Sequence, residues 1–105
     1  MSGISTHLLD TAAGRPACGV AVRLFHYDEE IAHGTTDDDG RCPALLPNDA
    51  VLHPGIYRIV FDVAGKFPDG FYPEITVSFR VDDTSAHYHV PLLVSPFGYT
   101  TYRGS

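Results

Sequence analysis

The sequence has 105 residues, a formal net charge of −6, and 44% hydrophobic residues that include six Tyr and six Phe. This composition predicts a single globular domain over residues 1–105 rather than a disordered chain. The negative charge argues against nucleic acid or an anionic membrane as the partner, and no segment approaches the ~20 apolar residues that cross a bilayer. A small anionic ligand stays compatible with this charge, because a local group of Arg and His side chains can outweigh the net field.

The chain contains two cysteines, Cys18 and Cys42. Two cysteines are too few for a disulfide framework, so we expect both to be reduced and buried. Residues 1–10 have neither the basic start nor the long apolar run of a secretory signal. These features together predict a cytoplasmic location.

Short runs of alternating apolar and polar residues recur along the chain, with turn residues between them and no convincing amphipathic helix. This pattern predicts an all-β sandwich or barrel. Residues 64–73 contain two Gly and two Pro, so we expect at most one turn of helix there. The strands expected before residue 87 cover residues 4–10, 20–27, 31–36, 41–45, 56–63 and 74–81.

Residues 87–105 predict two further strands joined by a tight turn. The turn is Ser-Pro-Phe-Gly at residues 95–98, in which Pro presets φ and Gly tolerates a positive φ. The period of two places His87 and His89 on one face of the first strand, and Tyr102 on one face of the second. Because chain ends are usually frayed and polar, a final strand that carries Tyr and Arg predicts an end that is held in place and used.

Several side chains suggest metal binding, and we weigh each against a simpler interpretation. The pair His87 and His89 could chelate zinc with a third ligand such as His7, but no Cys or carboxylate accompanies the pair at ligand spacing. Asp37-Asp38-Asp39-Gly40 lacks the alternating ligands and the distant Glu of a calcium loop, so we interpret it as a solvated turn. We therefore predict no metal and no cofactor, and we interpret the other histidines as ordinary surface residues: His26, His33 and His53.

Two segments of the chain carry a resemblance to a known family. The stretch HYHVPLLVSPFGYTTYRGS at residues 87–105 resembles the C-terminal signature of the 5-hydroxyisourate hydrolases, the transthyretin-related enzymes of urate breakdown. The opening ISTHLLD at residues 4–10, followed by GRPA at residues 14–17, is similar to the other signature of that family. The resemblance covers nearly the whole chain. It implies a transthyretin-like sandwich of two four-stranded sheets with little or no helix, assembled as a homotetramer with sites between its dimers.

The resemblance also implies which residues form the site. Strand parity is compatible with this selection, because His7, His89 and Tyr102 each lie on one face of their strand and Arg41 begins another. If these strands are neighbours in one sheet, all four side chains reach one solvent-facing surface. The catalytic residues implied are His7, Arg41, His89 and Ser105, and the substrate-binding residues implied are His7, Arg41, Tyr102, Arg103 and Gly104.

The implied reaction is hydrolysis of 5-hydroxyisourate to 2-oxo-4-hydroxy-4-carboxy-5-ureidoimidazoline, without a metal. His7 and His89 suit an acid–base pair and Arg41 suits an oxyanion stabiliser, while the division of tasks between the two histidines stays open. The main alternative is a small-ligand carrier of the transthyretin type, although that branch lacks the His, Arg, His and Tyr set and Tyr102 should narrow the channel. A third possibility is a structural domain without a ligand.

Overall fold

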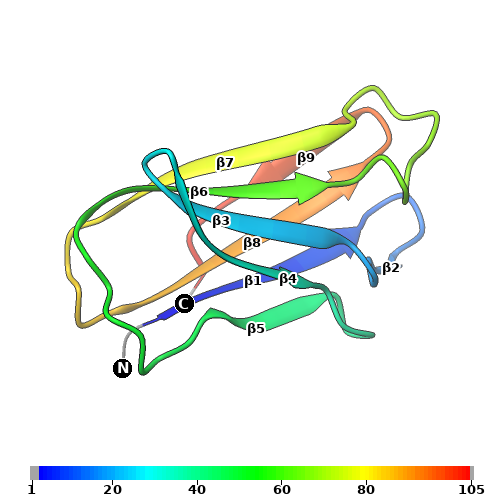
Figure 1. Ribbon diagram of the computed structural model, residues 1–105. Helices are drawn as coiled ribbons and strands as arrows, with labels where there is room; N and C mark the ends of the chain where they lie inside the picture. The colour runs from blue at the N-terminus through cyan, green and yellow to red at the C-terminus, as the bar shows by residue number, and fades with distance from the viewer. Residues whose placement is uncertain (1–2, 105) are drawn as a thin grey trace.

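The computed structural model describes residues 3–104, and within them it contains nine β-strands and no helix (Figure 1). The all-β prediction is therefore confirmed, and residues 64–73 form turns only. The strands are β1 (Gly3–Asp10), β2 (Arg15–Pro16), β3 (Ala21–His26), β4 (Glu29–Thr35), β5 (Arg41–Leu46), β6 (Gly55–Asp62), β7 (Glu74–Val81), β8 (His87–Ser95) and β9 (Gly98–Thr101).

The strands form the two stacked sheets that the resemblance implied. The first sheet has the order β2-β1-β8-β9, with β5 also paired to β1, and the second has the order β4-β3-β6-β7. Strands β1 and β8 pair in parallel along the whole of β1, while the other pairs are antiparallel. Within residues 3–104, the departure from two four-stranded sheets is the two-residue strand β2. It pairs with the end of β1 on the same side of β1 as β5.

The core lies between the sheets and follows the predicted alternation. Tyr57, Ile59 and Phe61 of β6 are buried against Leu8 of β1 and Leu92 of β8. Burying each large apolar side chain of this kind contributes about 1.5–3 kcal/mol. The inward faces of β1 and β8 are therefore fixed by packing, and their outward faces are set by the same alternation.

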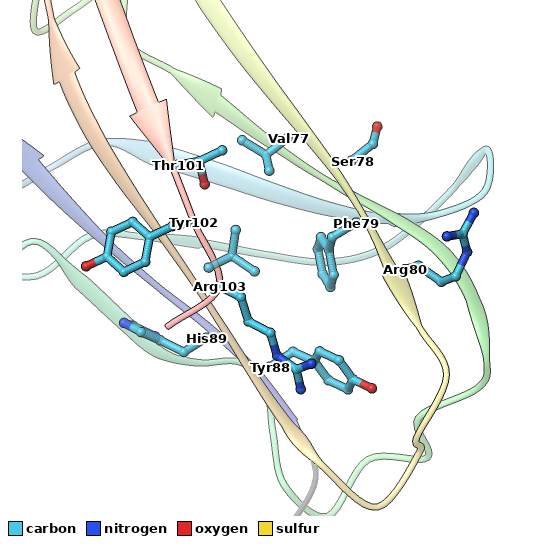
Figure 2. A pocket seen from close by; sticks show the side chains of 10 residues that line it. Val77, Ser78, Phe79, Arg80, Tyr88, His89, Thr101, Tyr102 and Arg103 are labelled. Atoms are coloured by element: carbon cyan, nitrogen blue, oxygen red, sulfur yellow. The ribbon is translucent and has the colours of Figure 1, made fainter. Parts of the chain in front are cut away.

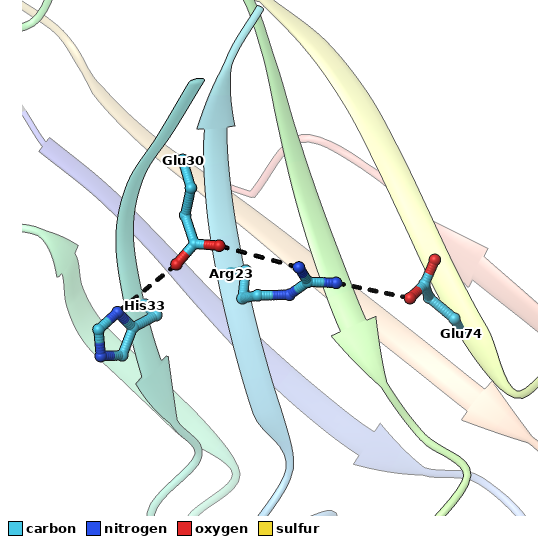
Figure 3. Close-up of polar contacts among 4 residues, drawn as sticks. All are labelled: Arg23, Glu30, His33 and Glu74. Atoms are coloured by element: carbon cyan, nitrogen blue, oxygen red, sulfur yellow. Dashed lines mark ion pairs between the residues drawn. The ribbon is translucent and has the colours of Figure 1, made fainter. Parts of the chain in front are cut away.

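The outer face of the second sheet carries a charged network (Figure 3). Arg23 of β3 lies 3.8 Å from Glu30 and 3.6 Å from Glu74, and His33 lies 3.7 Å from the other oxygen of Glu30. These side chains are exposed, so each pair contributes about 0–1 kcal/mol. This face is a solvated surface, and the interpretation of His33 as a surface residue is confirmed.

One prediction about a single residue is wrong. Cys18 is exposed in the connection between β2 and β3, whereas Cys42 is buried as expected and both thiols are free. His53 is exposed and His26 is half-buried, so both lie at the surface as interpreted. Their rings also stack with centroids 6.2 Å apart, and His26 stacks on Tyr57 at 4.4 Å. The loop before β6 folds back over the end of β3, which sequence spacing does not reveal.

Within residues 3–104, no helix is long and apolar enough to span a membrane.

Thr36 closes the connection between β2 and β3, which supports the two sheets at one end. Its hydroxyl donates to the Ala17 carbonyl at 2.8 Å and accepts from the Val20 amide at 2.9 Å, while the side chain is buried. We predict that Thr36→Val lowers the free energy of unfolding by about 1–3 kcal/mol, because it leaves buried polar groups unpaired. The matched control is Thr35→Val at an exposed position, which should change stability by about 0.5 kcal/mol or less. Urea titration measures both, and equal effects would contradict the assignment.

Candidate functional site

The outward face of the first sheet brings three predicted site residues together. His7 of β1 lies directly opposite Arg41 of β5 in the antiparallel register, and opposite Pro91 of β8 in the parallel register. Ser5 of β1, which shares the face of His7, lies opposite His89. Side chains of directly opposed residues in an antiparallel pair start about 4.5–5.5 Å apart at Cβ. The two sequence signatures therefore meet on one surface, with Arg41 beside them.

A turn places Arg41 at the start of β5. The Asp37 carboxylate accepts hydrogen bonds from the backbone amides of Asp39 and Arg41, both at 2.9 Å. Gly40 has a φ of 74° and its carbonyl accepts from the Leu8 amide at 2.7 Å. A Cβ at Gly40 would collide with the Leu8 carbonyl oxygen, so glycine is required there. The Asp-rich segment thus serves as a turn that docks β5 onto β1.

Ser5 holds the imidazole of His89. The Ser5 hydroxyl lies 2.8 Å from Nδ1 of His89 and 2.8 Å from Nε2 of His87, and Ser5 is only 6% exposed. Because Nδ1 of His89 has this partner, Nε2 is the nitrogen left for a ligand or a water. Ser5 and His87 were not assigned to the site from the sequence, although Ser5 shares the strand face of His7 and His87 shares that of His89.

The surroundings of His89 favour its neutral form. Burial lowers the pKa of His89 below its ordinary value of 6.5, and the positive charges of Arg41, His7 and His87 lower it further. At neutral pH the ring is therefore uncharged and can accept a proton. A neutral imidazole beside a guanidinium is an arrangement suited to activating water and stabilising the negative charge that develops on an oxygen.

Gly104 and Tyr102 border His89 from the end of the chain. The Gly104 amide donates to the His89 carbonyl at 2.8 Å, and a Cβ at Gly104 would lie 2.5 Å from Cδ2 of the His89 ring. Only glycine lets the chain pass this close to the imidazole. Tyr102 is 57% exposed and projects to the same side of β9 as His89 (Figure 2). It forms an exposed apolar wall beside the ring.

Arg103 projects to the other side of the sheet. Its guanidinium lies over the Tyr88 ring at 4.8 Å, and it lines a cleft of about 230 Å³ between β7 and the ends of β8 and β9 (Figure 2). This cation–π contact anchors the end of the chain, since such contacts contribute about 0.5–2 kcal/mol. The Arg103 side chain does not join Arg41 and His7, but the cleft that it lines also includes His89 and Tyr102, so its expected contact with substrate stays a prediction. Ser105 lies outside the described residues.

A shallow hollow of about 240 Å³ lies over the outward face. Its lining includes Arg41, His87 and His89, and its floor includes Ser5. Among residues 3–104 no group of three or more His, Cys, Asp or Glu side chains is arranged to hold a metal ion. The rings of His87 and His89 both contact the Ser5 hydroxyl.

Comparison with known proteins gives one consistent family. A family model described as HIUase/Transthyretin family matches residues 4–104. A 5-hydroxyisourate hydrolase of Salmonella dublin is 46% identical over 110 residues, covering 97% of this chain and 80% of that protein. The structure of Klebsiella pneumoniae 5-hydroxyisourate hydrolase superposes with a TM-score of 0.90 at 33% identity and covers 100% of both chains. Sea bream transthyretin in complex with thyroxine superposes with a TM-score of 0.88 at 29% identity, covering 96% of this chain and 93% of that one.

The contact between Gly104 and His89 predicts the effect of a single methyl group. Gly104→Ala should displace the His89 ring, because the new Cβ would lie 2.5 Å from Cδ2. We expect the imidazole resonances of His89 to shift in NMR spectra while the protein stays folded. The control is Gly98→Ala in the same hairpin, where a Cβ meets nothing closer than 3.9 Å. Unchanged His89 resonances in Gly104→Ala would contradict this role.

Proposed function

The chain belongs to the HIUase/transthyretin family, and from this premise we propose that it hydrolyses 5-hydroxyisourate to 2-oxo-4-hydroxy-4-carboxy-5-ureidoimidazoline without a metal ion. The broader activity rests on relatives that match nearly the whole chain: it is a hydrolase of urate degradation. The finer proposal rests on the placement of the His89 imidazole, whose pKa is lowered first by burial, on the same open face as Arg41 and His7.

The reaction opens a ring at an amide-type C–N bond, and it needs an activated water, a stabiliser for the oxyanion and a proton for the leaving nitrogen. His89 is suited to take the proton from water, because its lowered pKa keeps Nε2 unprotonated at neutral pH. Since the neutral form is the active one, activity limited by His89 is retained as the pH falls through 6.5 and is lost only at lower pH.

Arg41 is suited to stabilise the oxyanion. Its guanidinium offers forked donors and a permanent charge, and none of the described residues forms a carboxylate ion pair with it within 4.0 Å. It can therefore direct those donors to substrate oxygens. His7 lies opposite Arg41 in the register and is suited to supply the proton to the leaving nitrogen. Removal of one oxyanion donor of this kind typically costs about 10²–10³-fold in turnover.

Assembly would complete this site. In one chain the hollow is shallow and open, and half-buried or exposed apolar side chains lie along the same sheet, including Leu9, Leu93 and Tyr102. We propose that a homotetramer covers this face, so that substrate binds in a channel between dimers. Sedimentation velocity measures the assembly directly, and a monomer that hydrolyses substrate at full rate would contradict the role of the partner subunits.

A carrier is the second candidate, because the fold also matches sea bream transthyretin in complex with thyroxine. Ultraviolet absorbance separates the two functions. Freshly generated 5-hydroxyisourate decays spontaneously, so an enzyme accelerates its decay at substoichiometric concentration, whereas a carrier slows the decay in proportion to its sites.

Chelators and added zinc should leave the acceleration unchanged. Loss of activity on chelation, restored by zinc, would overturn the proposal of a metal-free site.

The acid–base pair gives a prediction about two histidines. We expect His7→Asn and His89→Asn each to reduce turnover by about 10²-fold or more, because each removes a group that exchanges protons in the reaction. The matched control is His33→Asn on the other sheet, which should hydrolyse at the wild-type rate. The absorbance assay measures all three, and circular dichroism verifies their folds. Near wild-type turnover in either site variant would remove that histidine from the mechanism.

The wall beside His89 gives a prediction about ligand size. We expect Tyr102→Thr to weaken hydrolysis and to admit larger aromatic ligands, because the smaller side chain opens the space over the His89 ring. Tyr102→Phe is the control, since it keeps the ring and removes only the hydroxyl. Hydrolysis and calorimetric binding of an aromatic ligand provide the two measurements. If Tyr102→Thr matches wild type in both, Tyr102 does not border the substrate.

A further inference from the structure

Ser5 lies between two histidines that come from the neighbouring strand. The parallel register places Ser5 opposite His89 and places residue 3 opposite His87, so the Ser5 hydroxyl sits between the two rings. Its two contacts, to His89 Nδ1 and His87 Nε2, are both 2.8 Å long. His87 is exposed at the other end of this chain of contacts, whereas Ser5 is nearly buried. The three side chains form a continuous path from His89 to solvent.

Counting protons shows that the two rings are coupled. A hydroxyl has one proton to donate, so at least one of the two imidazole nitrogens carries an N–H, and in the two relay states Ser5 donates to one ring and accepts from the N–H of the other. When Ser5 donates to His87 Nε2, His89 carries its proton on Nδ1 and its Nε2 is bare. When Ser5 donates to His89 Nδ1, His89 carries its proton on Nε2 and His87 carries one on its own Nε2. The tautomer of His89 is therefore tied to the state of His87.

We propose that Ser5 and His87 are positioning residues that form a proton relay, which sets the tautomer of His89 and carries protons between His89 and solvent. This inference rests on the proposed hydrolysis for its role in catalysis. The relay itself is a property of the free protein and is measured without substrate.

The relay moves one proton from the attacking water to solvent through His89, Ser5 and His87. His89 begins with a bare Nε2 and takes a proton there from the attacking water, which makes it an imidazolium. Its Nδ1 proton passes to the Ser5 oxygen, while the original Ser5 proton passes to His87 Nε2. His87 then releases its Nδ1 proton to solvent. Both rings end neutral, the Ser5 hydroxyl is restored, and His89 carries its single proton on Nε2, while the proton for the leaving nitrogen comes from His7. Release of the Nε2 proton to solvent, with return of a proton through His87 and Ser5 to Nδ1, restores the starting tautomer.

The surroundings of His89 disfavour a second proton on its ring, so a path that carries this proton to solvent would assist the reaction. Burial and three neighbouring basic groups disfavour a charged His89 ring. A proton held there would raise the free energy of the site, whereas a proton on exposed His87 is solvated. The charged or titratable side chains that face His89 are Arg41 from β5, His7 from β1 and His87 from β8. Those that line the neighbouring cleft with it are Arg80 from β7, Tyr88 from β8, and Tyr102 and Arg103 after β9.

Two variants test the relay, with Ser78→Ala at an exposed position of β7 as the control. Ser5→Ala removes the bridging hydroxyl, and His87→Gln keeps a polar partner for Ser5 but cannot exchange a proton. We expect each to lower kcat by about 10-fold, less than the loss of His89 itself, with KM little changed. In ¹⁵N NMR titrations of the imidazoles, we expect His89 Nδ1 to respond to the titration of His87 in wild type and to lose that response in Ser5→Ala.

Each outcome decides the proposal. Unchanged kcat and unchanged coupling in Ser5→Ala overturn the relay, and so does a lower kcat with the coupling intact, because the hydroxyl would then act through packing alone. If Ser5→Ala fails to fold, a wild-type rate in His87→Gln overturns it, since His87 is exposed. Activity retained in His89→Asn would instead reject the proposed hydrolytic mechanism. The coupling in the NMR titration would still report on the relay.

Discussion

The site depends on the parallel pairing of β1 with β8 in the middle of the first sheet. This register places Ser5 beside His89 and His7 beside Pro91, so that the two ends of the chain share one surface. Side chains alternate along a strand, so a slip of one residue would turn this set into the core and expose Leu8 and Leu92. Packing between the sheets therefore fixes the chemistry on the outward face. The inward residues, 0% exposed at both leucines, prevent the slip.

The two sheets have outer faces of different character. On the second sheet, acidic and basic side chains pair with one another and remain solvated, as with Arg23 and Glu30. On the first sheet, none of the described residues pairs a carboxylate with Arg41, and burial together with the charges of Arg41, His7 and His87 lowers the pKa of His89. A cation without a carboxylate partner is costly to cover unless a ligand supplies negative charge. Such a face suits a small anionic or oxygen-rich ligand.

Strand parity made much of the site predictable from sequence. Alternation placed His7, His89 and Tyr102 on outward faces, and the family signatures selected those positions among six histidines. Register was not predictable in the same way, because period-two patterns do not state which residues of two strands lie opposite each other. Ser5 was missed for this reason, since its partners lie 82 and 84 residues away in the sequence.

Two further differences between the sequence-based predictions and the structure are confined to short segments. The second of the two strands expected within residues 87–105 ends at Thr101, after which Gly104 bridges to His89 and Arg103 turns toward Tyr88. Cys18 was expected to be buried and is exposed in the connection between β2 and β3. Composition does not encode where a side chain in such a connection lies.

The most direct measurement is a crystal structure of the protein with bound uric acid, which keeps the fused rings of the substrate without its reactive centre. We expect uric acid on the outward face of the first sheet, with its oxygens on the Arg41 guanidinium and its ring within hydrogen-bonding distance of His89 Nε2. Uric acid bound in the cleft beside Arg103 and Tyr88, or bound without contact to Arg41, would contradict it.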